Sequence, residues 1–483
     1  MILETVGILF VFILLIYPFF LCGSFFYSGF WLKLKRKFMR PNIIFSMCDD
    51  QRHDCMSCAD HQFIATPNLD RLAEEGIRFT NGFTGIPLCA PSRATHLTGL
   101  YPHQHGVVHN RAQLKTEVDT WPELLQKAGY RTGFFGKIHY STTTQPSGMP
   151  QAGFDRWVSF QGQGEYNDPT LIIDGESIRH QGYNTDLLAD YANKFIMNED
   201  ERPWAICVWF KAPHGPFTPP SRYADSYADI ELDLPKAFNA STIGKPLSLR
   251  TRKPMGHEHG WYPDGTFIRD KYWDQFMRDY VRTIQGVDDA MGSFLNTLDQ
   301  NGLTENTMVI HTSDHGYFHG EFGLADKRWM YDPSIRIPYL IRYPNLVQSV
   351  GKSIDDLVLS LDIPATIMDF CGLGVPNNYQ GYSLRPLLVK DGKWNRQNVF
   401  IEYFEDPPFP DLPSMLCLRT QTRKLIRYLR SGEGDEFYDL DQDPEERHNV
   451  INEPNYAEQV EDLQRQLDSA KLRYNFAKPE SIR

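Results

Sequence analysis

Short apolar runs that end in polar residues recur along the chain and are typical of buried parallel strands. The clearest runs cover residues 42–47, 130–135, 204–210, 307–312, 336–343 and 357–361. Between them, amphipathic or well-capped segments predict helices over residues 67–75, 121–128, 270–298, 363–371 and 456–474. The alternation of strands and helices predicts an α/β fold with a large β-sheet flanked by helices.

Two stretches depart from this alternation. Residues 221–265 are rich in proline, glycine and charge without periodicity, which predicts an insertion or lid. After about residue 394, short strands, an acidic turn and a helix predict a small C-terminal α+β subdomain. We therefore expect a main domain over residues 39–393 and a subdomain over residues 394–483.

The N-terminal segment, residues 1–38, is strongly apolar and has no charged residue between Glu4 and Lys33. It is long enough to span a bilayer and lacks the basic start and cleavage site of a secretory signal, so we expect an uncleaved membrane anchor through residues 5–32. The cations that follow favour a cytoplasmic body, although a single span leaves the side open. The alternative is that Met39 is the true start, which makes the protein cytoplasmic.

The composition narrows the class of protein. With 41% hydrophobic and 23% charged residues in 483, the chain is globular rather than disordered or fibrous. The net charge of -12 argues against a nucleic-acid partner, and the aromatic share of 13% favours a carbohydrate or aryl pocket. Eight scattered cysteines do not form a secreted disulfide scaffold, and we interpret the CxxC of Cys55 and Cys58 as structural.

Candidate metal-binding and catalytic residues lie where predicted strands end. Asp49 and Asp50 follow the first strand, and Asp314 and His315 follow the strand at 307–312. Ligands of open α/β sheets bind at this edge. His214 lies in an Ala-Pro-His-Gly turn after another strand, which is a common setting for a catalytic side chain.

The sharpest signal is the run Cys-Ala-Pro-Ser-Arg-Ala-Thr-His-Leu-Thr-Gly over residues 89–99. A helix that begins near Pro91 would place Cys89 at a helix N-terminus, where unpaired N–H groups and the guanidinium of Arg93 stabilise negative charge. The run resembles the signature C-x-P-S-R-x-x-x-L-T-G of the type I sulfatases, and the resemblance extends over about nine-tenths of the chain. It implies an alkaline-phosphatase-like sandwich, a large mixed sheet between helices.

The resemblance implies a modified cysteine and a bound metal ion. In this family a maturation enzyme oxidises the signature cysteine, here Cys89, to a formylglycine that acts as the nucleophile. One divalent cation, usually Ca²⁺, is held by acids and an amide or imidazole, and the matching metal ligands are Asp49, Asp50, Cys89, Asp314 and His315. The oxygen-rich set also suits Mg²⁺, and the imidazole in place of an amide slightly favours Mn²⁺.

Further positions match the family's catalytic groups. Lys137 and His139 stand in a G-K-x-H element, in which the lysine contacts the nucleophile and sulfate and the histidine helps to release sulfate. His214 matches the histidine that protonates the departing alcohol, and Lys327 matches a second sulfate-binding lysine. Together with Cys89 and Arg93 they are the predicted catalytic residues of a sulfuric ester hydrolase.

Two alternatives to a sulfatase stay open at this stage. The Asp314-His315 pair also occurs in phosphonate monoester and phosphodiester hydrolases of the same superfamily, whereas residues 320–331 look like carbohydrate-directed sulfatases. A chain whose Cys89 is never modified would be a catalytically silent binder of sulfated glycans. The run His257-Glu258-His259 is more typical of a solvated loop than of a second metal site, and His103 and His105 have no assigned role. The sequence gives no oligomeric state.

Overall fold

The structure is a computed structural model, and it describes residues 40–251, 273–345, 347, 350–390 and 392–479. Residues 41–483 group as one compact unit. The expected anchor in residues 1–38 and the His257-Glu258-His259 run lie outside the described residues. Among the residues that are described, no helix is long and apolar enough to cross a membrane.

A mixed sheet forms the centre of the unit. In the described part of the chain it has ten strands, in the order β15 (Lys352–Ile354), β2 (Ile77–Phe79), β14 (Tyr339–Arg342), β11 (Thr307–Ser313), β1 (Asn42–Cys48), β10 (Trp204–Trp209), β5 (Arg131–Gly136), β7 (Arg156–Ser159), β8 (Thr170–Ile173) and β9 (Glu176–Arg179). The neighbours from β11 to β7 are parallel, while β14 and β8 join antiparallel. The carboxyl ends of the central strands therefore meet at one edge.

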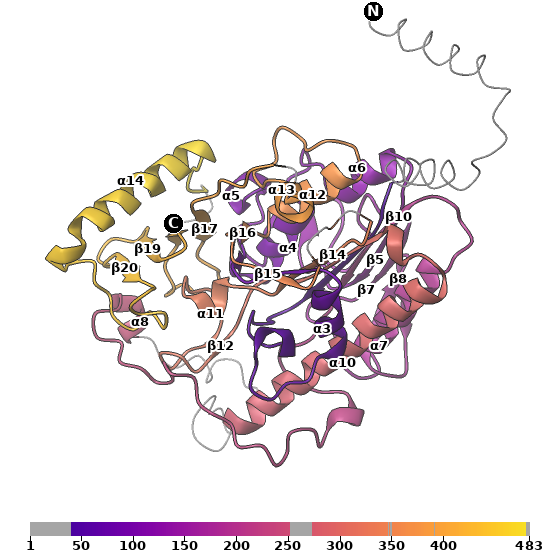
Figure 1. Cartoon of the computed structure of the whole chain (residues 1–483), viewed down its shortest axis with the longest axis horizontal. Coiled ribbons are helices and arrows are strands. Elements are labelled where there is room, and N and C mark those ends of the chain that lie inside the picture. Colours follow the sequence, from indigo (N-terminus) through magenta and orange to yellow (C-terminus); the bar gives the residue numbers. More distant parts are fainter. Residues whose placement is uncertain (1–39, 252–272, 346, 348–349, 391, 480–483) are drawn as a thin grey trace, which may run out of the picture. The chain divides into compact units, whose positions relative to one another are not determined.

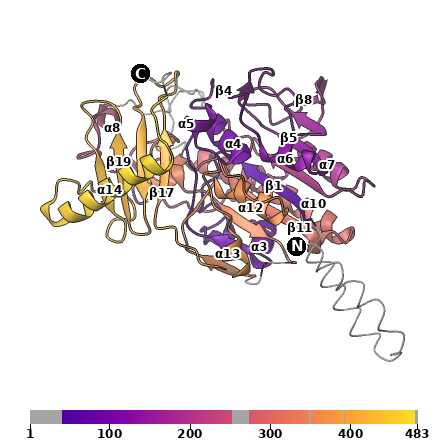
Figure 2. The same ribbon diagram turned by 90° about the horizontal axis from the view of Figure 1, so that it is seen from above.

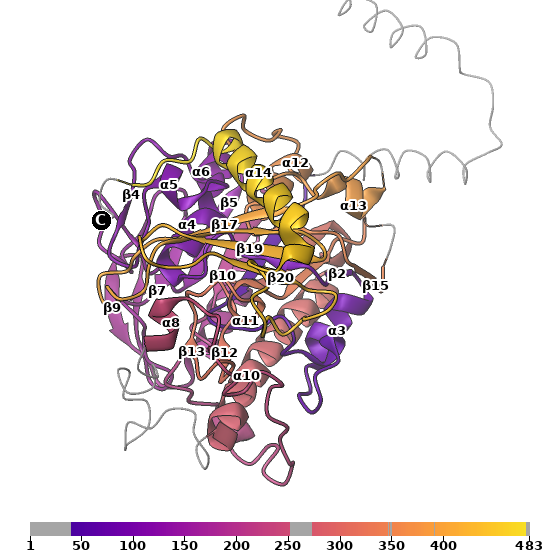
Figure 3. The same cartoon turned by 90° about the vertical axis from the view of Figure 1, so that its left-hand side faces the viewer.

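Successive residues of the central strands face opposite layers. Ile43, Phe45 and Met47 of β1 belong to one hydrophobic core, whereas Ile44 and Cys48 belong to another. The first core packs under α4 (Cys89–Thr98), α6 (Trp121–Lys127), α12 (Asp362–Phe370) and α13 (Arg385–Val389). The second packs against α3 (Pro67–Glu74), α7 (Asn184–Ile196) and α10 (Trp273–Gln300). Figures 1 and 3 show the two groups of helices on opposite sides of the sheet. The α/β sandwich with a mixed sheet is confirmed.

The C-terminal part forms a second, antiparallel sheet of β17 (Val399–Tyr403), β18 (Met415–Arg419), β19 (Arg423–Tyr428) and β20 (Glu436–Asp439). Helix α14 (Ala457–Arg473) buries Val460, Leu463 and Leu467 against β18 and β19 (Figure 2). The predicted subdomain is therefore present, and its boundary at residues 393/394 stays a prediction.

The remaining described elements are short. They are β3 (Gly82–Phe83), α5 (Pro102–His105), β4 (Gln113–Leu114), β6 (Ser141–Thr142), α8 (Leu247–Thr251), β12 (Phe318–His319), β13 (Ala325–Asp326), α11 (Asp332–Ile335) and β16 (Val358–Leu359). Of the predicted insertion at 221–265, the described part includes α8 and no strand. The strand predicted at 357–361 is in fact β16, which pairs with β3 outside the main sheet.

Candidate active site

Cys89 is the first residue of α4 and is almost fully buried. The sequence predicted a helix beginning near Pro91, but α4 begins two residues earlier, so the cysteine itself lies in the first turn. Burial, with Asp49 next in effect, raises the pKa of the Cys89 thiol far above its usual range. An unmodified Cys89 is therefore a poor thiolate nucleophile at neutral pH.

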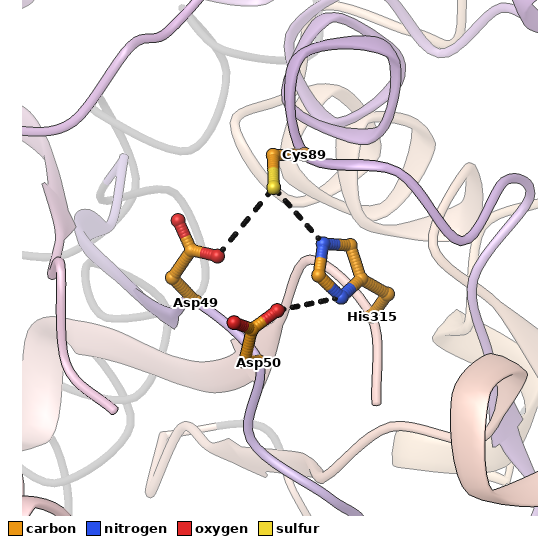
Figure 4. Close-up of side chains that lie close together, drawn as sticks. All are labelled: Asp49, Asp50, Cys89 and His315. Carbon is orange, nitrogen blue, oxygen red and sulfur yellow. Dashed lines mark hydrogen bonds and ion pairs between the residues drawn. The ribbon is translucent and has the colours of Figure 1, made fainter. Parts of the chain in front are cut away.

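Four predicted metal ligands converge around this thiol. Donor atoms of Asp49, Asp50, Cys89 and His315 all lie within 4.8 Å of one another (Figure 4). The thiol donates to Asp49 Oδ1 at 3.6 Å and lies 3.3 Å from His315 Nε2, while His315 Nδ1 lies 3.3 Å from Asp50 Oδ1. These residues come from β1, α4 and the end of β11, so the topology of the sheet brings them together.

Asp314, the fifth predicted ligand, lies beside this group rather than within it. Its Oδ1 accepts the backbone N–H groups of Asp50 at 3.2 Å and His315 at 3.0 Å, and lies 3.4 Å from His315 Nε2. Its Oδ2 accepts from Arg93 Nε at 3.1 Å. The carboxylate is therefore held in place by three donors while one oxygen stays close to the imidazole.

The donor set fits a hard divalent cation. Asp50 Oδ2 is buried and has no hydrogen-bond partner among the described residues. Burial raises the pKa of Asp50 to about 8, with Asp49 and Asp314 adding to the rise and Lys327 opposing it. Burial also lowers the pKa of His315 to about 4, so the imidazole is neutral, as a metal ligand must be. A cation among these carboxylates would remove their mutual repulsion.

Three predicted cationic residues surround the carboxylates. Arg93 is fully buried, and its Nη2 lies 3.0 Å from Asp49 Oδ2 and 2.9 Å from Asp314 Oδ2. Lys137, directly after β5, contacts Asp49, and Lys327, directly after β13, donates to Asp50 Oδ1 at 2.6 Å. Because Arg93 pairs with the carboxylates of both Asp49 and Asp314, it positions these two predicted metal ligands. The two lysines each bring a primary ammonium group to the cluster.

The two predicted catalytic histidines border the cluster. His214 Nδ1 is 2.7 Å from the Gly215 carbonyl oxygen, and its Nε2 lies 3.8 Å from Asp50 Oδ2. His139 Nδ1 is buried without a hydrogen-bond partner among the described side chains. Burial and the nearby lysines hold the pKa of both rings well below the usual value. Both imidazoles are therefore neutral in the resting site.

Four non-glycine residues near the site have a strained backbone. Asp50 (φ 73°), His139 (φ 71°), Asp326 (φ 73°) and Arg328 (φ 85°) all adopt the left-handed conformation. Non-glycine residues there cost about 1 kcal/mol or more each, and such positions cluster at functional sites. Lys327 is thus held between two strained residues, which fixes the direction from which it approaches Asp50.

Sequence reasoning missed three residues that support the site. Gln163 contacts Lys137 through its side-chain oxygen, and Lys211 and Tyr166 contact the backbone around His214. No motif marks Gln163 or Tyr166, because both lie in loop sequence after β7. Lys211 stands three residues before His214, and that proximity was the only signal for it.

The chain also matches known protein families. The family model for sulfatases matches residues 41–373, and a model described as N-sulphoglucosamine sulphohydrolase, C-terminal, matches residues 320–473. An N-acetylglucosamine-6-O-sulfatase of Bacteroides thetaiotaomicron is 33% identical, over 92% of this chain and 89% of that protein.

Solved structures give the same result for the fold. A protein determined in complex with its substrate D-glucosamine-2-N,6-O-disulfate superposes with a TM-score of 0.83 at 32% identity, covering 90% of this chain and 98% of that one. A phosphonate monoester hydrolase of Agrobacterium radiobacter superposes with a TM-score of 0.76 at 23% identity, covering 90% and 96%, which shows a shared fold alone.

Proposed function

The chain belongs to the sulfatase family and is a sulfuric ester hydrolase, and we propose that it removes a 6-O-sulfate from a glucosamine unit of a glycan. Two comparisons, one of sequence and one of structure, support the substrate class. The sequence relative is named for sulfate at position 6 of N-acetylglucosamine, and the structural neighbour was solved with a glucosamine that carries a 6-O-sulfate. Both match this chain along almost its whole length, including the C-terminal subdomain.

The observation that carries the proposal is the position of Cys89. It begins α4, faces Asp49 and His315, and has Lys137 and Lys327 across the two carboxylates. Because its thiol is buried and protonated, we propose that a maturation enzyme converts Cys89 to formylglycine. Sulfatases carry this group as a family, and its hydrate supplies a hydroxyl nucleophile that a protonated thiol does not.

We propose that the cation is Ca²⁺, held by Asp49, Asp50, Asp314 and His315 together with the modified residue 89. When bound, it would hold a sulfate oxygen and stabilise the negative charge of the transition state. Four residues supply oxygen and neutral nitrogen donors, and three of them are carboxylates, which Ca²⁺ and Mg²⁺ prefer over softer metals.

The remaining residues have separate roles in this proposal. Lys137 and Lys327 bind sulfate oxygens through their ammonium groups, and Arg93 fixes the carboxylates of Asp49 and Asp314. His214 donates a proton to the departing sugar oxygen through Nε2, since its Nδ1 is bonded to the Gly215 carbonyl. An arriving sulfate ester is an anion and offsets the two lysines, so it favours the protonated imidazole. His139 removes a proton from residue 89 when sulfate leaves.

Sulfate release from defined sugars tests the proposal. The full chain is produced with a formylglycine-generating enzyme and Ca²⁺, and assayed on glucosamine 6-O-sulfate, glucosamine 3-O-sulfate and a phenylphosphonate monoester. We expect the 6-O-sulfate to be hydrolysed at least ~100-fold more efficiently than the others, because hydroxyl and amide contacts in a site discriminate strongly by position. Faster turnover of the phosphonate would support the phosphonate hydrolase instead. Binding of the sugar without sulfate release by the modified protein would support a silent binder.

We also propose a membrane anchor in residues 5–32. No described residue bears on it, and the support is the apolar, uncharged sequence alone. Fractionation of cells that produce the full chain, compared with a chain that starts at Met39, tests it. Recovery of the full chain in the soluble fraction, with residues 1–38 present by mass, would contradict the anchor.

A further inference from the structure

Lys211 is a buried lysine that the proposed reaction does not use. It lies two residues beyond β10, is 2% exposed, and has no carboxylate within ion-pair distance among the described residues. Burial, with a smaller effect of Lys137, lowers the pKa of Lys211 to about 7. Burying an ammonium without an ion-pair partner is costly, so its position calls for a reason other than stability.

The contacts of Lys211 all concern the turn that carries His214. Its Nζ donates to the Gly215 carbonyl oxygen at 3.2 Å, and the same oxygen lies 2.7 Å from His214 Nδ1. The backbone N–H of His214 donates to the Lys211 carbonyl at 2.9 Å, which closes the turn. One carbonyl thus receives both the lysine ammonium and the imidazole N–H.

Tyr166 holds the neighbouring carbonyl from another part of the chain. Its hydroxyl donates to the His214 carbonyl oxygen at 2.6 Å, and the Lys211 ammonium lies 4.7 Å from the centre of the Tyr166 ring. Tyr166 is 5% exposed. The two side chains therefore contact each other and fix the two successive carbonyls of His214 and Gly215.

We propose that Lys211 and Tyr166 are positioning residues that fix the imidazole of His214, with Nδ1 on the Gly215 carbonyl and Nε2 towards the leaving group. This inference rests on the proposed role of His214 as the proton donor. Holding both carbonyls fixes two successive peptide planes, and the second of them carries the Gly215 oxygen to which Nδ1 donates. A proton donor displaced by about 1 Å can cost up to ~100-fold in rate.

Three variants separate positioning from general stability. Lys211→Met keeps the length and removes the ammonium, Lys211→Arg keeps the cation, and Tyr166→Phe removes only the hydroxyl. Lys127→Met is the matched control, because Lys127 lies on α6 and its side chain is 65% exposed. Each protein is assayed below its melting temperature on glucosamine 6-O-sulfate.

We expect Lys211→Met to lower kcat about tenfold with KM changed less than twofold, Lys211→Arg to restore most of the loss, and Tyr166→Phe to lower kcat about threefold. Lys127→Met should match the parent. In a His214→Ala background, Lys211→Met should change kcat less than twofold, because its effect acts through the imidazole.

The outcomes distinguish this inference from the function on which it rests. If His214→Ala lowers turnover and Lys211→Met multiplies that loss in the double variant, or if Lys211→Met leaves the parent unchanged, the positioning role is wrong and the proposed function stands. If His214→Ala keeps full turnover, the assigned role of His214 fails first. A crystal structure of Lys211→Met gives a readout independent of activity. We expect a rotated His214 ring whose Nδ1 no longer contacts the Gly215 carbonyl, and an unchanged ring would overturn the inference.

Discussion

Among the buried clusters of charged side chains in the described part of the chain, two are built differently. The catalytic cluster consists of Asp49, Asp50, Cys89, Asp314 and His315 with Arg93, Lys137 and Lys327. The support cluster, where α11 and the segment before α8 meet β19 and β20, consists of Lys245, Asp332, Lys424, Glu436 and Glu446. Both are shielded from water, so each has a strong effect on free energy.

The support cluster is satisfied within the chain. Lys424 Nζ donates to Asp332 Oδ1 and Glu446 Oε1 at 2.5 Å each and to the Met330 carbonyl at 3.0 Å. Lys245 donates to the hydroxyl of Tyr438 at 2.6 Å and lies over three aromatic rings. None of the five described side chains has a buried polar atom without a partner.

The catalytic cluster is left incomplete. Asp50 Oδ2 and the neighbouring His139 Nδ1 have no hydrogen-bond partner among the described residues. A satisfied cluster stabilises the fold, whereas an incomplete one keeps capacity for a ligand that is not part of the chain. Charge and burial alone therefore do not separate these two clusters, whereas the unpartnered Asp50 Oδ2 does.

The largest effect should come from Cys89→Ala. Removal of the nucleophile's precursor should lower kcat by ~10⁴-fold or more, since the other groups act only through it. Sulfate release measures the loss, and thermal melting shows that the fold remains. Cys58→Ala, a partly buried cysteine in η1 (Ser57–Ala59), is the matched control and should keep normal turnover. Substantial activity in Cys89→Ala would remove the nucleophile from the proposed site.

Removal of the metal should come next. Dialysis against a chelator should lower turnover at least ~100-fold, and added Ca²⁺ should restore it and raise the unfolding free energy by about 3 kcal/mol at 100 times its Kd. Turnover and melting temperature are measured across a Ca²⁺ titration. Mg²⁺ and Mn²⁺ are titrated in parallel. Restoration by Mn²⁺ alone would correct the metal, and full activity in chelator would contradict the metal site.

Lys137→Met tests whether the incomplete cluster contributes more to rate than to stability. Loss of the ammonium that is proposed to bind sulfate should lower kcat about 10²- to 10³-fold. Lys127→Met is its control on the surface. The melting temperature in the presence of Ca²⁺ should change little. A variant that unfolds but keeps its turnover per folded molecule would place Lys137 with the structural lysines.

Lys424→Met is the corresponding test of the support cluster. It leaves Glu446 buried without its lysine and Asp332 paired with Arg419 at 3.3 Å and Arg336 at 4.0 Å, which should reduce the free energy of unfolding by about 3–5 kcal/mol. Chemical denaturation measures this change, and turnover per folded molecule should stay within twofold. If turnover falls while stability holds, the distinction between the two clusters is wrong.

The smallest expected effect is a change in stability from a hydrogen-bonded side-chain pair between α5 and β17. His103 Nδ1 lies 2.7 Å from Glu402 Oε2, and although burial opposes it, Glu402 raises the pKa of His103. The pair should stabilise the fold below about pH 6.5, which is the pKa of a histidine in the unfolded chain. This contribution should be lost as the pH rises through the higher pKa of His103 in the folded protein. His103→Gln should thus cost on the order of 1 kcal/mol at pH 6 and less at pH 9, by denaturant unfolding. An equal cost at both pH values would contradict a charged pair.

Much of the fold followed from local pattern. The runs at 42–47, 204–210 and 307–312 are buried strands because other strands pair with both of their edges and helices cover both faces of the sheet. The capped segments 67–75 and 121–128 are helices within a residue of the predicted ends. The strands β7 to β9 and helix α7 were not predicted. The edge strand β9 is wholly exposed and shows no apolar run, so its partner β8 defines it.

The sequence predicted the metal ligands of the site better than the residues that hold the catalytic side chains in place. Asp49, Asp50 and His315 end strands of one sheet, so strand order alone brings them together. Gln163, Tyr166 and Lys211 act through contacts that depend on loop conformation, which no residue pattern encodes. Likewise, the sequence did not show that Asp314 would be held by Arg93 and two backbone amides rather than lie among the four converging donors.

The mass of the tryptic peptide 79–93, taken from protein that releases sulfate, tests the central claim most directly. Trypsin cleaves after Arg78 and after Arg93, and Cys89 is the only cysteine in this peptide. We predict a peptide about 18 Da lighter than the unmodified thiol form, which is the change from cysteine to formylglycine. Sulfate release by protein whose Cys89 is wholly the unmodified thiol would contradict the account.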